Sequence, residues 1–357
     1  MNKKITEKLK LAMWGMVIAL SFSSCEKEDD KQEIIPEEAK DYIYVLNNGL
    51  FGQDNASLTM YNVETGLATE GYFEAQNGRK LGDTGQDILV YGSKMYIAMQ
   101  KESTVEVTDL NAKSIKQIKT DGEPRYFTSY GGKIYVTYFN GYVARIDTTS
   151  LVVETKVNVG RNPEQLSVAN GKIYVANSGG MDYPDYDKTV SVIDIASFTE
   201  TQKLDVAVNP QYIAVDRQEN VYVVSTGNYA DVPVTLQKID SKTNVVSVLD
   251  VKGSYITILG DTLYMIHADY DENGNQKINY YSYDVVNNRI ISDNFVGATA
   301  FFADPYQISS DKASSEVYIT TSDYVNTGDV YVFDKDGKFL YSFEAGLNPV
   351  KAVKIKK

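Results

Sequence analysis

The stretch PRYFTSYGGKIYVTYFNGYVARID, residues 124–147, decides the fold. Its centre, Ile134-Tyr135-Val136, places a Tyr between aliphatic residues, and such runs predict strands that are buried on both faces. The turn Gly131-Gly132-Lys133 joins this run to a strand that begins at Pro124, and an alternating run that ends in Asp follows it. With a further apolar run at 152–157, this part of the chain predicts four consecutive antiparallel strands.

The Tyr-centred run recurs along the chain. Its seven copies are Ile43-Tyr44-Val45, Met95-Tyr96-Ile97, Ile134-Tyr135-Val136, Ile173-Tyr174-Val175, Val221-Tyr222-Val223, Leu263-Tyr264-Met265 and Val317-Tyr318-Ile319. Four strands per unit, without an amphipathic helix, are typical of a propeller blade. Residues 41–357 allow about 45 residues per unit, the usual length of such a blade. We therefore expect an all-β, seven-bladed β-propeller over residues 41–357, with six or eight blades as the alternatives.

The two ends of this region predict how the ring closes. The first unit begins directly at its central strand, Tyr42–Val45, whereas the last unit is followed by an unassigned strand, Pro349–Ile355. We expect the C-terminal strand to pair into the first blade, because closure removes an exposed sheet edge.

Residues 1–24 predict a lipoprotein signal peptide. Lys residues precede the apolar run at 11–21, which is too short to span a bilayer as a helix. Small residues before Cys25 resemble the lipobox of bacterial lipoproteins, with Phe22 where Leu is usual, so we expect Cys25 to be lipidated. The alternative is an ordinary secretory peptide with an incidental Cys.

Residues 25–40 predict an acidic, flexible tether. Its acidic cluster at 26–30 resembles the signal that sends lipoproteins of Bacteroides-type bacteria to the cell surface. We therefore expect a protein anchored by lipid in the outer membrane and exposed at the cell surface.

Composition excludes several classes of function. The chain has 35 basic and 48 acidic residues, and this balance argues against a nucleic-acid partner. One Cys and one His exclude a disulfide scaffold and a multi-histidine metal site. The sequence contains no P-loop, Rossmann fingerprint or nucleophile elbow. We expect no enzyme, no cofactor and no bound metal; a propeller enzyme that uses Asp87, Glu164 or Asp304 is the alternative.

Two weaker signals favour structural roles. Residues 269–275 match the start of a calcium loop, but the twelfth position is Tyr280 instead of Glu, so we expect a polar turn. His267 follows a central strand, and we expect it to be structural rather than a metal ligand.

One face of the ring carries the long loops, and binding is usually found on such loops. Tyr126, Tyr212, Tyr255 and Tyr306 are expected at the starts of the innermost strands on that face. Five further tyrosines fall in the loops themselves: Tyr183, Tyr186, Tyr229, Tyr270 and Tyr324. Tyr side chains offer stiff, amphipathic surface for a planar ligand or a sugar.

Four segments carry a family resemblance. The family segments N-E-G-N-F, N-A-S-L, N-G-x-K-L-G-D and P-R-Y of YVTN/YncE-like seven-bladed propellers are resembled by Asn47-Asn48-Gly49-Leu50-Phe51, Asn55-Ala56-Ser57-Leu58, residues 77–83 and Pro124-Arg125-Tyr126. Asn48 and Leu50 replace the usual Glu and Asn. The resemblance extends to surface lipoproteins of gut Bacteroides-type bacteria, among them the BtuG-type proteins that capture vitamin B12 and cap a TonB-dependent transporter.

The resemblance implies a function and a ligand. It implies capture of a corrinoid of the cobalamin class, as transported ligand and not as cofactor, and its transfer to a TonB-dependent outer-membrane transporter. The alternative is a surface propeller that binds glycan or protein without catalysis. For the amides of a corrinoid we expect contacts from five side chains near the tyrosines: Gln86, Arg125, Gln165, Gln211 and Gln307.

Overall fold

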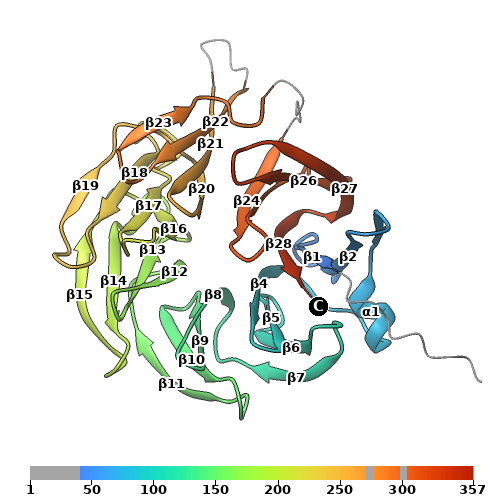
Figure 1. The fold of residues 1–357 in the computed structure, drawn as a ribbon. Coiled ribbons are helices and arrows are strands. Elements are labelled where there is room, and N and C mark those ends of the chain that lie inside the picture. Colours follow the sequence, from blue (N-terminus) through green and yellow to red (C-terminus); the bar gives the residue numbers. More distant parts are fainter. Residues whose placement is uncertain (1–40, 271–275, 298–303, 357) are drawn as a thin grey trace, which may run out of the picture. The chain divides into compact units, whose positions relative to one another are not determined.

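Seven four-stranded antiparallel sheets follow one another around a ring (Figure 1). The computed structural model describes residues 41–270, 276–297 and 304–356, within the compact unit Ala39–Lys357. The predicted seven-bladed β-propeller is confirmed. The predicted signal peptide, tether and Cys25 lie outside the described residues.

The strands of each blade are given from the centre of the ring outward. Blade 1 contains β28 (Pro349–Ile355), β1 (Tyr42–Asn47), β2 (Ser57–Asn62) and β3 (Leu67–Thr69). Blade 2 contains β4 (Gly85–Tyr91), β5 (Lys94–Met99), β6 (Thr104–Asp109) and β7 (Ser114–Lys119). Blade 3 contains β8 (Pro124–Tyr130), β9 (Lys133–Tyr138), β10 (Tyr142–Asp147) and β11 (Val153–Asn158). Blade 4 contains β12 (Pro163–Ala169), β13 (Lys172–Asn177), β14 (Thr189–Asp194) and β15 (Thr199–Asp205).

Three blades complete the ring. Blade 5 contains β16 (Pro210–Val215), β17 (Val221–Ser225), β18 (Thr235–Ile239) and β19 (Val246–Val248). Blade 6 contains β20 (Tyr255–Leu259), β21 (Thr262–Tyr270), β22 (Gln276–Asp284) and β23 (Arg289–Ser292). Blade 7 contains β24 (Pro305–Asp311), β25 (Glu316–Thr321), β26 (Thr327–Asp334) and β27 (Phe339–Leu347).

The Tyr at the centre of each repeat is a core residue, as expected. All seven are buried, with at most 2% of their surface exposed. Several of their hydroxyls donate to the next blade: Tyr44 to the carbonyl of Leu110 and Tyr174 to that of Ser241, both at 3.2 Å. The repeated Tyr is therefore a buried packing residue, and in blades 1, 4 and 6 its hydroxyl also satisfies a carbonyl in a turn of the following blade.

The C-terminal strand closes the ring as predicted. β28 pairs antiparallel with β1, so that Tyr42 lies opposite Ile355 and Val45 opposite Ala352. Two ion pairs fasten β28 to both neighbouring blades. Lys354 Nζ lies 2.9 Å from Glu316 Oε1 of blade 7, and Lys351 Nζ lies 2.7 Å from Asp87 Oδ1 of blade 2.

The structure contains one helix that the sequence pattern did not indicate. α1 (Tyr72–Asn77) lies in the connection from blade 1 to blade 2, and Phe73 is its buried residue. Asn77 Nδ2 donates to the carbonyls of Phe73 and Ala112, which fixes the end of the helix. The helix lies outside the four-stranded repeats, and its six residues are too few to show a helical period in the sequence.

Blade 6 also differs from expectation. The polar turn expected at residues 269–275 begins later, because β21 continues to Tyr270, and β22 begins at Gln276. Residues 271–275, with most of the calcium-like segment, lie outside the described part of the chain. Among the described residues no group of three His, Cys, Asp or Glu side chains could hold a metal ion.

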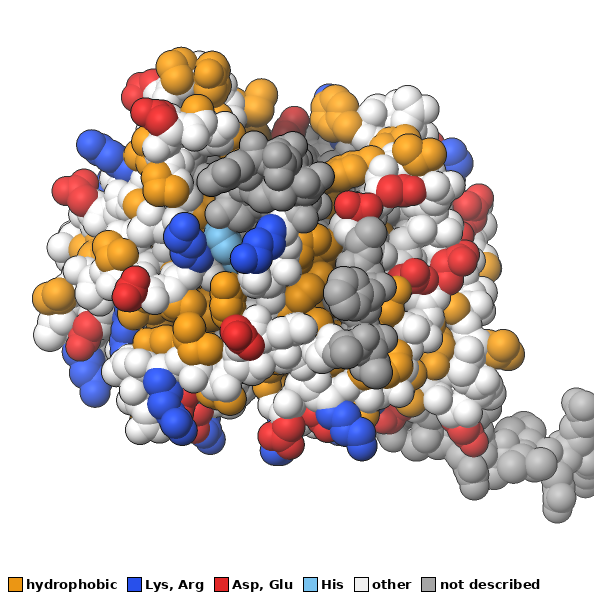
Figure 2. All heavy atoms as spheres, turned by 90° about the horizontal axis from the view of Figure 1, so that it is seen from above, with side chains coloured by type: hydrophobic (Ala, Val, Ile, Leu, Met, Phe, Trp, Pro, Cys, Tyr) orange, Lys and Arg blue, Asp and Glu red, His pale blue; other side chains and the backbone are white. Residues whose placement is uncertain are grey.

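The upper and lower edges of the ring, seen from the side, carry different kinds of side chain. Figure 2 shows raised groups of hydrophobic side chains at the upper edge, and Lys, Arg, Asp and Glu side chains mixed along the lower edge. Large exposed side chains include Met181, Tyr183, Tyr229, Tyr324 and Val325, all in loops between the second and third strands of their blades. In the described residues no helix is long and apolar enough to cross a membrane.

Candidate functional site

A cavity of about 760 Å³ lies in the central channel, between the innermost strands of the seven blades. We use "channel mouth" for the part of it that is lined by the first residues of these strands. These residues are Gln86, Arg125, Tyr126, Glu164, Gln165, Gln211, Tyr212, Tyr255, Tyr306 and Gln307. The four tyrosines expected at the starts of the innermost strands and the five polar residues expected near them therefore all line one cavity.

β-Bulges place these side chains in the mouth. The register of the innermost strand shifts after Gly85, Pro124, Pro163, Pro210 and Pro305, each time at the start of the strand. A bulge leaves extra residues unpaired and turns their side chains away from the regular alternation. The residues inside these bulges include Gln86, Arg125, Tyr126, Glu164, Gln165, Gln211 and Tyr306.

A left-handed residue precedes several of the bulges. Asn162, Asn209 and Asp304 have φ of 43°, 63° and 60°, and each stands directly before the Pro that begins the strand. Asn and Asp adopt this conformation at lower cost than other residues with a Cβ. In blades 4, 5 and 7 the Asn/Asp-Pro pair therefore marks where the innermost strand begins and where its bulge follows.

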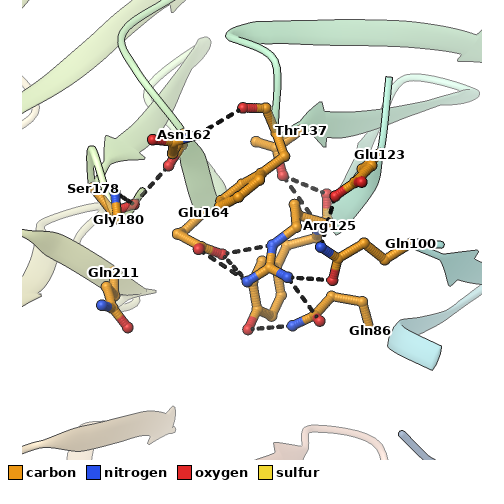
Figure 3. Close-up of polar contacts among 12 residues, drawn as sticks. Gln86, Gln100, Glu123, Arg125, Thr137, Asn162, Glu164, Ser178, Gly180 and Gln211 are labelled. Atoms are coloured by element: carbon orange, nitrogen blue, oxygen red, sulfur yellow. Dashed lines mark hydrogen bonds and ion pairs between the residues drawn. The ribbon is translucent and has the colours of Figure 1, made fainter. Parts of the chain in front are cut away.

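Arg125 is the centre of a polar network on blades 2 to 4 (Figure 3). Its Nη2 lies 2.7 Å from Glu164 Oε2, and its Nε donates to the same carboxylate at 3.0 Å. Its Nη1 donates to Gln86 Oε1 at 2.9 Å and to Gln100 Oε1 at 2.6 Å. Gln100 in turn donates to Glu123 at 2.8 Å. Most of the N–H donors of Arg125 are therefore bonded to other side chains of the protein.

This network is buried and charged. The side chains of Arg125 and Glu164 are 15% and 9% exposed. Burial opposes the charge on Arg125, but the Glu164 carboxylate more than offsets it and raises the pKa of the guanidinium. The guanidinium also lies 4.8 Å from the centre of the Phe139 ring. The pair is a fixed, neutral unit in the wall of the channel.

Aromatic rings dominate the mouth on blades 5 to 7. Tyr212 and Tyr255 meet edge to face with ring centres 5.2 Å apart, and Tyr306 and Tyr324 do so at 5.5 Å. Burial raises the pKa of Tyr212 and Tyr306, and neighbouring tyrosines raise it further. These phenols are therefore neutral at physiological pH and present flat surface with hydrogen-bonding edges.

The loop tyrosines form a separate group. Tyr183, Tyr186 and Tyr229 contact one another edge to face, at 6.0 and 6.1 Å between ring centres, and do not line the channel. Tyr324 does line it. The side chain of Tyr270 lies outside the described part of the structure.

Two other candidates have internal partners. Gln165 Oε1 accepts from the backbone N–H of Ile213 at 2.9 Å, which ties blade 4 to blade 5. His267 is buried, with Nδ1 3.4 Å from Ser254 Oγ, and it does not line the channel. This position agrees with the structural role expected for His267.

The segments of blades 1 and 2 that resemble the propeller family mainly stabilise the loop after β1. Asp83 accepts from the backbone N–H groups of Gly52 and Asp54 at 3.1 and 3.3 Å, and from the Thr84 hydroxyl at 2.6 Å. Burial opposes the charge, yet these hydrogen bonds lower the pKa of Asp83. Asn55 accepts from the N–H of Leu50 at 2.8 Å. These residues therefore fix the loop after β1, whereas Arg125 and Tyr126 reach the mouth.

Sequence reasoning missed part of the site. Gln100 and Glu123 complete the Arg125 network, and Lys351 lines the channel from β28. Gln100 follows a central strand, so no repeat position pointed to it. Lys351 could have been found, because the strand Pro349–Ile355 was predicted to pair into the first blade.

The fold and the mouth define a seven-bladed propeller with a central polar and aromatic cavity. Residues 41–258, more than half of the chain, match the family described as "Domain of unknown function (DUF5074)", and the chain belongs to that family. No curated protein is similar to the chain. This propeller fold is consistent with a binding role.

Solved structures share the fold at low identity. A putative 6-phosphogluconolactonase from Bacteroides fragilis is 12% identical, with a TM-score of 0.63 over 89% of this chain and 99% of that one. Hydrazine synthase from Kuenenia stuttgartiensis is 13% identical, with a TM-score of 0.60 over 74% and 93%. The computationally designed protein Ika8 is 10% identical, with a TM-score of 0.56 over 85% and 88%. At these identities the likeness extends to the fold alone.

Proposed function

We propose that this protein is a non-enzymatic capture protein for a corrinoid. The observation that carries the proposal is the channel mouth, where tyrosines of blades 5 to 7 face the same cavity as the glutamines and Tyr126. A corrinoid is large, flat and mostly uncharged, with amides around its rim. Aromatic surface with a few convergent polar groups is what binding such a molecule requires.

The state of the carboxylates supports binding without catalysis. Glu164 is paired with Arg125. Asp87 is 2% exposed, and it accepts from Lys351 and from the backbone N–H of Phe127, both within 2.8 Å. A general acid or base must reach a substrate proton, and carboxylates held by two internal donors are poorly placed for it.

The N-terminal segment extends the proposal to the cell surface. Cys25 would carry the lipid anchor, and the captured corrinoid would pass to a TonB-dependent transporter in the same outer membrane. Replacing Cys25 by Ala is expected to leave the propeller folded and to release the protein from the membrane fraction. A Cys25→Ala protein that still fractionates with membranes would contradict the anchor.

Calorimetric titration with cyanocobalamin tests the ligand. We expect 1:1 binding with little change in the visible spectrum, because His267 is buried outside the channel and no ligand exchange at cobalt is required. No heat of binding at micromolar protein would overturn the corrinoid proposal and favour a glycan or protein ligand, which titrations with surface glycans would then address.

A further inference from the structure

The hydrogen bonds of Arg125 fix the orientation of the Gln86 amide. An arginine side chain only donates, so the group of Gln86 that faces Nη1 at 2.9 Å must be its oxygen. The other end of the amide, Nε2, then lies 2.9 Å from the hydroxyl of Tyr126. Because an amide NH₂ group only donates, the Tyr126 oxygen accepts this bond.

The Tyr126 hydroxyl is thereby left as a donor. Its oxygen is engaged by Gln86, and among the described residues none accepts its proton. Burial raises the pKa of Tyr126, and Glu164 raises it further, so the phenol keeps that proton. Tyr126 lines the cavity. A ligand in the mouth therefore meets a hydrogen-bond donor on blade 3.

Gln211 presents the opposite group on blade 5. Asn209 Nδ2 donates to the carbonyl of Gly227 at 3.2 Å, which leaves Asn209 Oδ1 as an acceptor. Gln211 Nε2 donates to that oxygen at 3.0 Å and to the Tyr229 hydroxyl at 3.0 Å. Its Oε1 has no donor among the described residues, and Gln211 lines the same cavity. Figure 3 shows Gln211 apart from the bonds of Arg125.

We infer that the channel mouth recognises neutral carboxamide groups and discriminates against carboxylates. Tyr126 donates to an amide oxygen, and Gln211 Oε1 accepts from an amide NH₂. A carboxylate can accept from Tyr126, but it has no proton for Gln211 and places a negative oxygen against an acceptor. The inference rests on the proposed corrinoid ligand and specifies which chemical groups of that ligand the channel mouth recognises.

Calorimetry with cyanocobalamin and its monocarboxylic acids, in which one propionamide is hydrolysed, tests the inference. Because an unpaired buried acceptor is costly, we expect at least one acid to bind about 10-fold more weakly than the amide. If every monoacid binds as tightly as cyanocobalamin, the inference is overturned while the corrinoid proposal stands. If cyanocobalamin itself does not bind, both are overturned.

Two variants assign the discrimination to its residues. Gln211→Leu should bring the amide-to-acid ratio close to one, because it removes the acceptor. Tyr126→Phe should weaken both ligands by roughly 3- to 10-fold and keep the ratio, because both accept its proton. Tyr130→Phe, at the exposed far end of β8, is the matched control and should leave binding unchanged. A ratio unchanged in Gln211→Leu protein of normal melting temperature would contradict the role of Gln211.

Discussion

On blades 2 to 4 the polar groups of the channel mouth bond to one another, whereas on blades 5 to 7 the tyrosine rings face the cavity. In the first half Arg125 holds Glu164, Gln86 and Gln100 within 3.0 Å. In the second half Tyr212 and Tyr306 contact other rings and line the channel. The two halves show that the type of a residue at the mouth does not determine whether its hydrogen-bonding groups are free to meet a ligand. The residues that contact it in the folded protein determine this.

The closing strand joins the two halves, and its removal should have the largest effect. Deleting residues 349–357 removes the β1 partner strand and the ion pairs of Lys351 and Lys354. Loss of one member of a buried pair costs about 3–5 kcal/mol, a large part of the roughly 5–15 kcal/mol that stabilises a domain. We expect loss of the cooperative thermal transition and aggregation on gel filtration.

A surface substitution in the same segment is the control for this deletion. Lys356 is exposed, and its Nζ contacts only the carbonyl of Ala313 in the described structure. Lys356→Ala should change the free energy of unfolding by less than about 0.5 kcal/mol. A deletion variant that melts at the wild-type temperature would rule out closure through β28.

Breaking the polar half alone should reduce stability by a smaller amount. Glu164→Leu leaves Arg125 buried without its carboxylate, which should cost about 3–5 kcal/mol in chemical denaturation. The double variant Arg125→Met/Glu164→Leu should recover much of this loss, because no unpaired charge remains. Equal losses in the single and double variants would show that packing, and not charge pairing, dominates this half.

Removing rings from the aromatic half should affect binding instead. Tyr212→Ala with Tyr306→Ala should weaken cyanocobalamin binding by about 2–4 kcal/mol in calorimetry, as for aromatic anchors at an interface.

The loop tyrosines should have the smallest effect. Tyr183→Ala with Tyr186→Ala removes two rings that lie outside the channel lining, so we expect cyanocobalamin binding to weaken by less than about 1 kcal/mol in the same titration. If this pair costs more than the mouth pair, the ligand contacts the long loop of blade 4.

The architecture could be predicted from the sequence because each blade repeats the same local pattern. The Tyr-centred strands, the turns and the unassigned Pro349–Ile355 strand each constrain the fold independently. α1 escaped prediction because its six residues bury a single aromatic side chain. Positions of the innermost strands could also be assigned, so the tyrosines and glutamines of the mouth were found.

What those side chains do could not be predicted. Gln165 was expected to contact a ligand, but its oxygen holds the N–H of Ile213 on the next blade. Gln100 belongs to the network through Arg125, which is 25 residues away in sequence. Such partners arise from bulges and from contacts between blades, and neither leaves a periodic signal in the chain.

Because the closing strand is the last strand of the chain, the central cavity is complete only when the C-terminal residues are present. Gly346 donates to Asn47, and Asn348 to Gly49, across 299 positions in each case. Contacts this distant form late and slowly during folding. The cavity takes its lining from every innermost strand, including Lys351 of β28. A chain interrupted during synthesis before residue 349 would therefore lack the part of the cavity wall that β28 supplies.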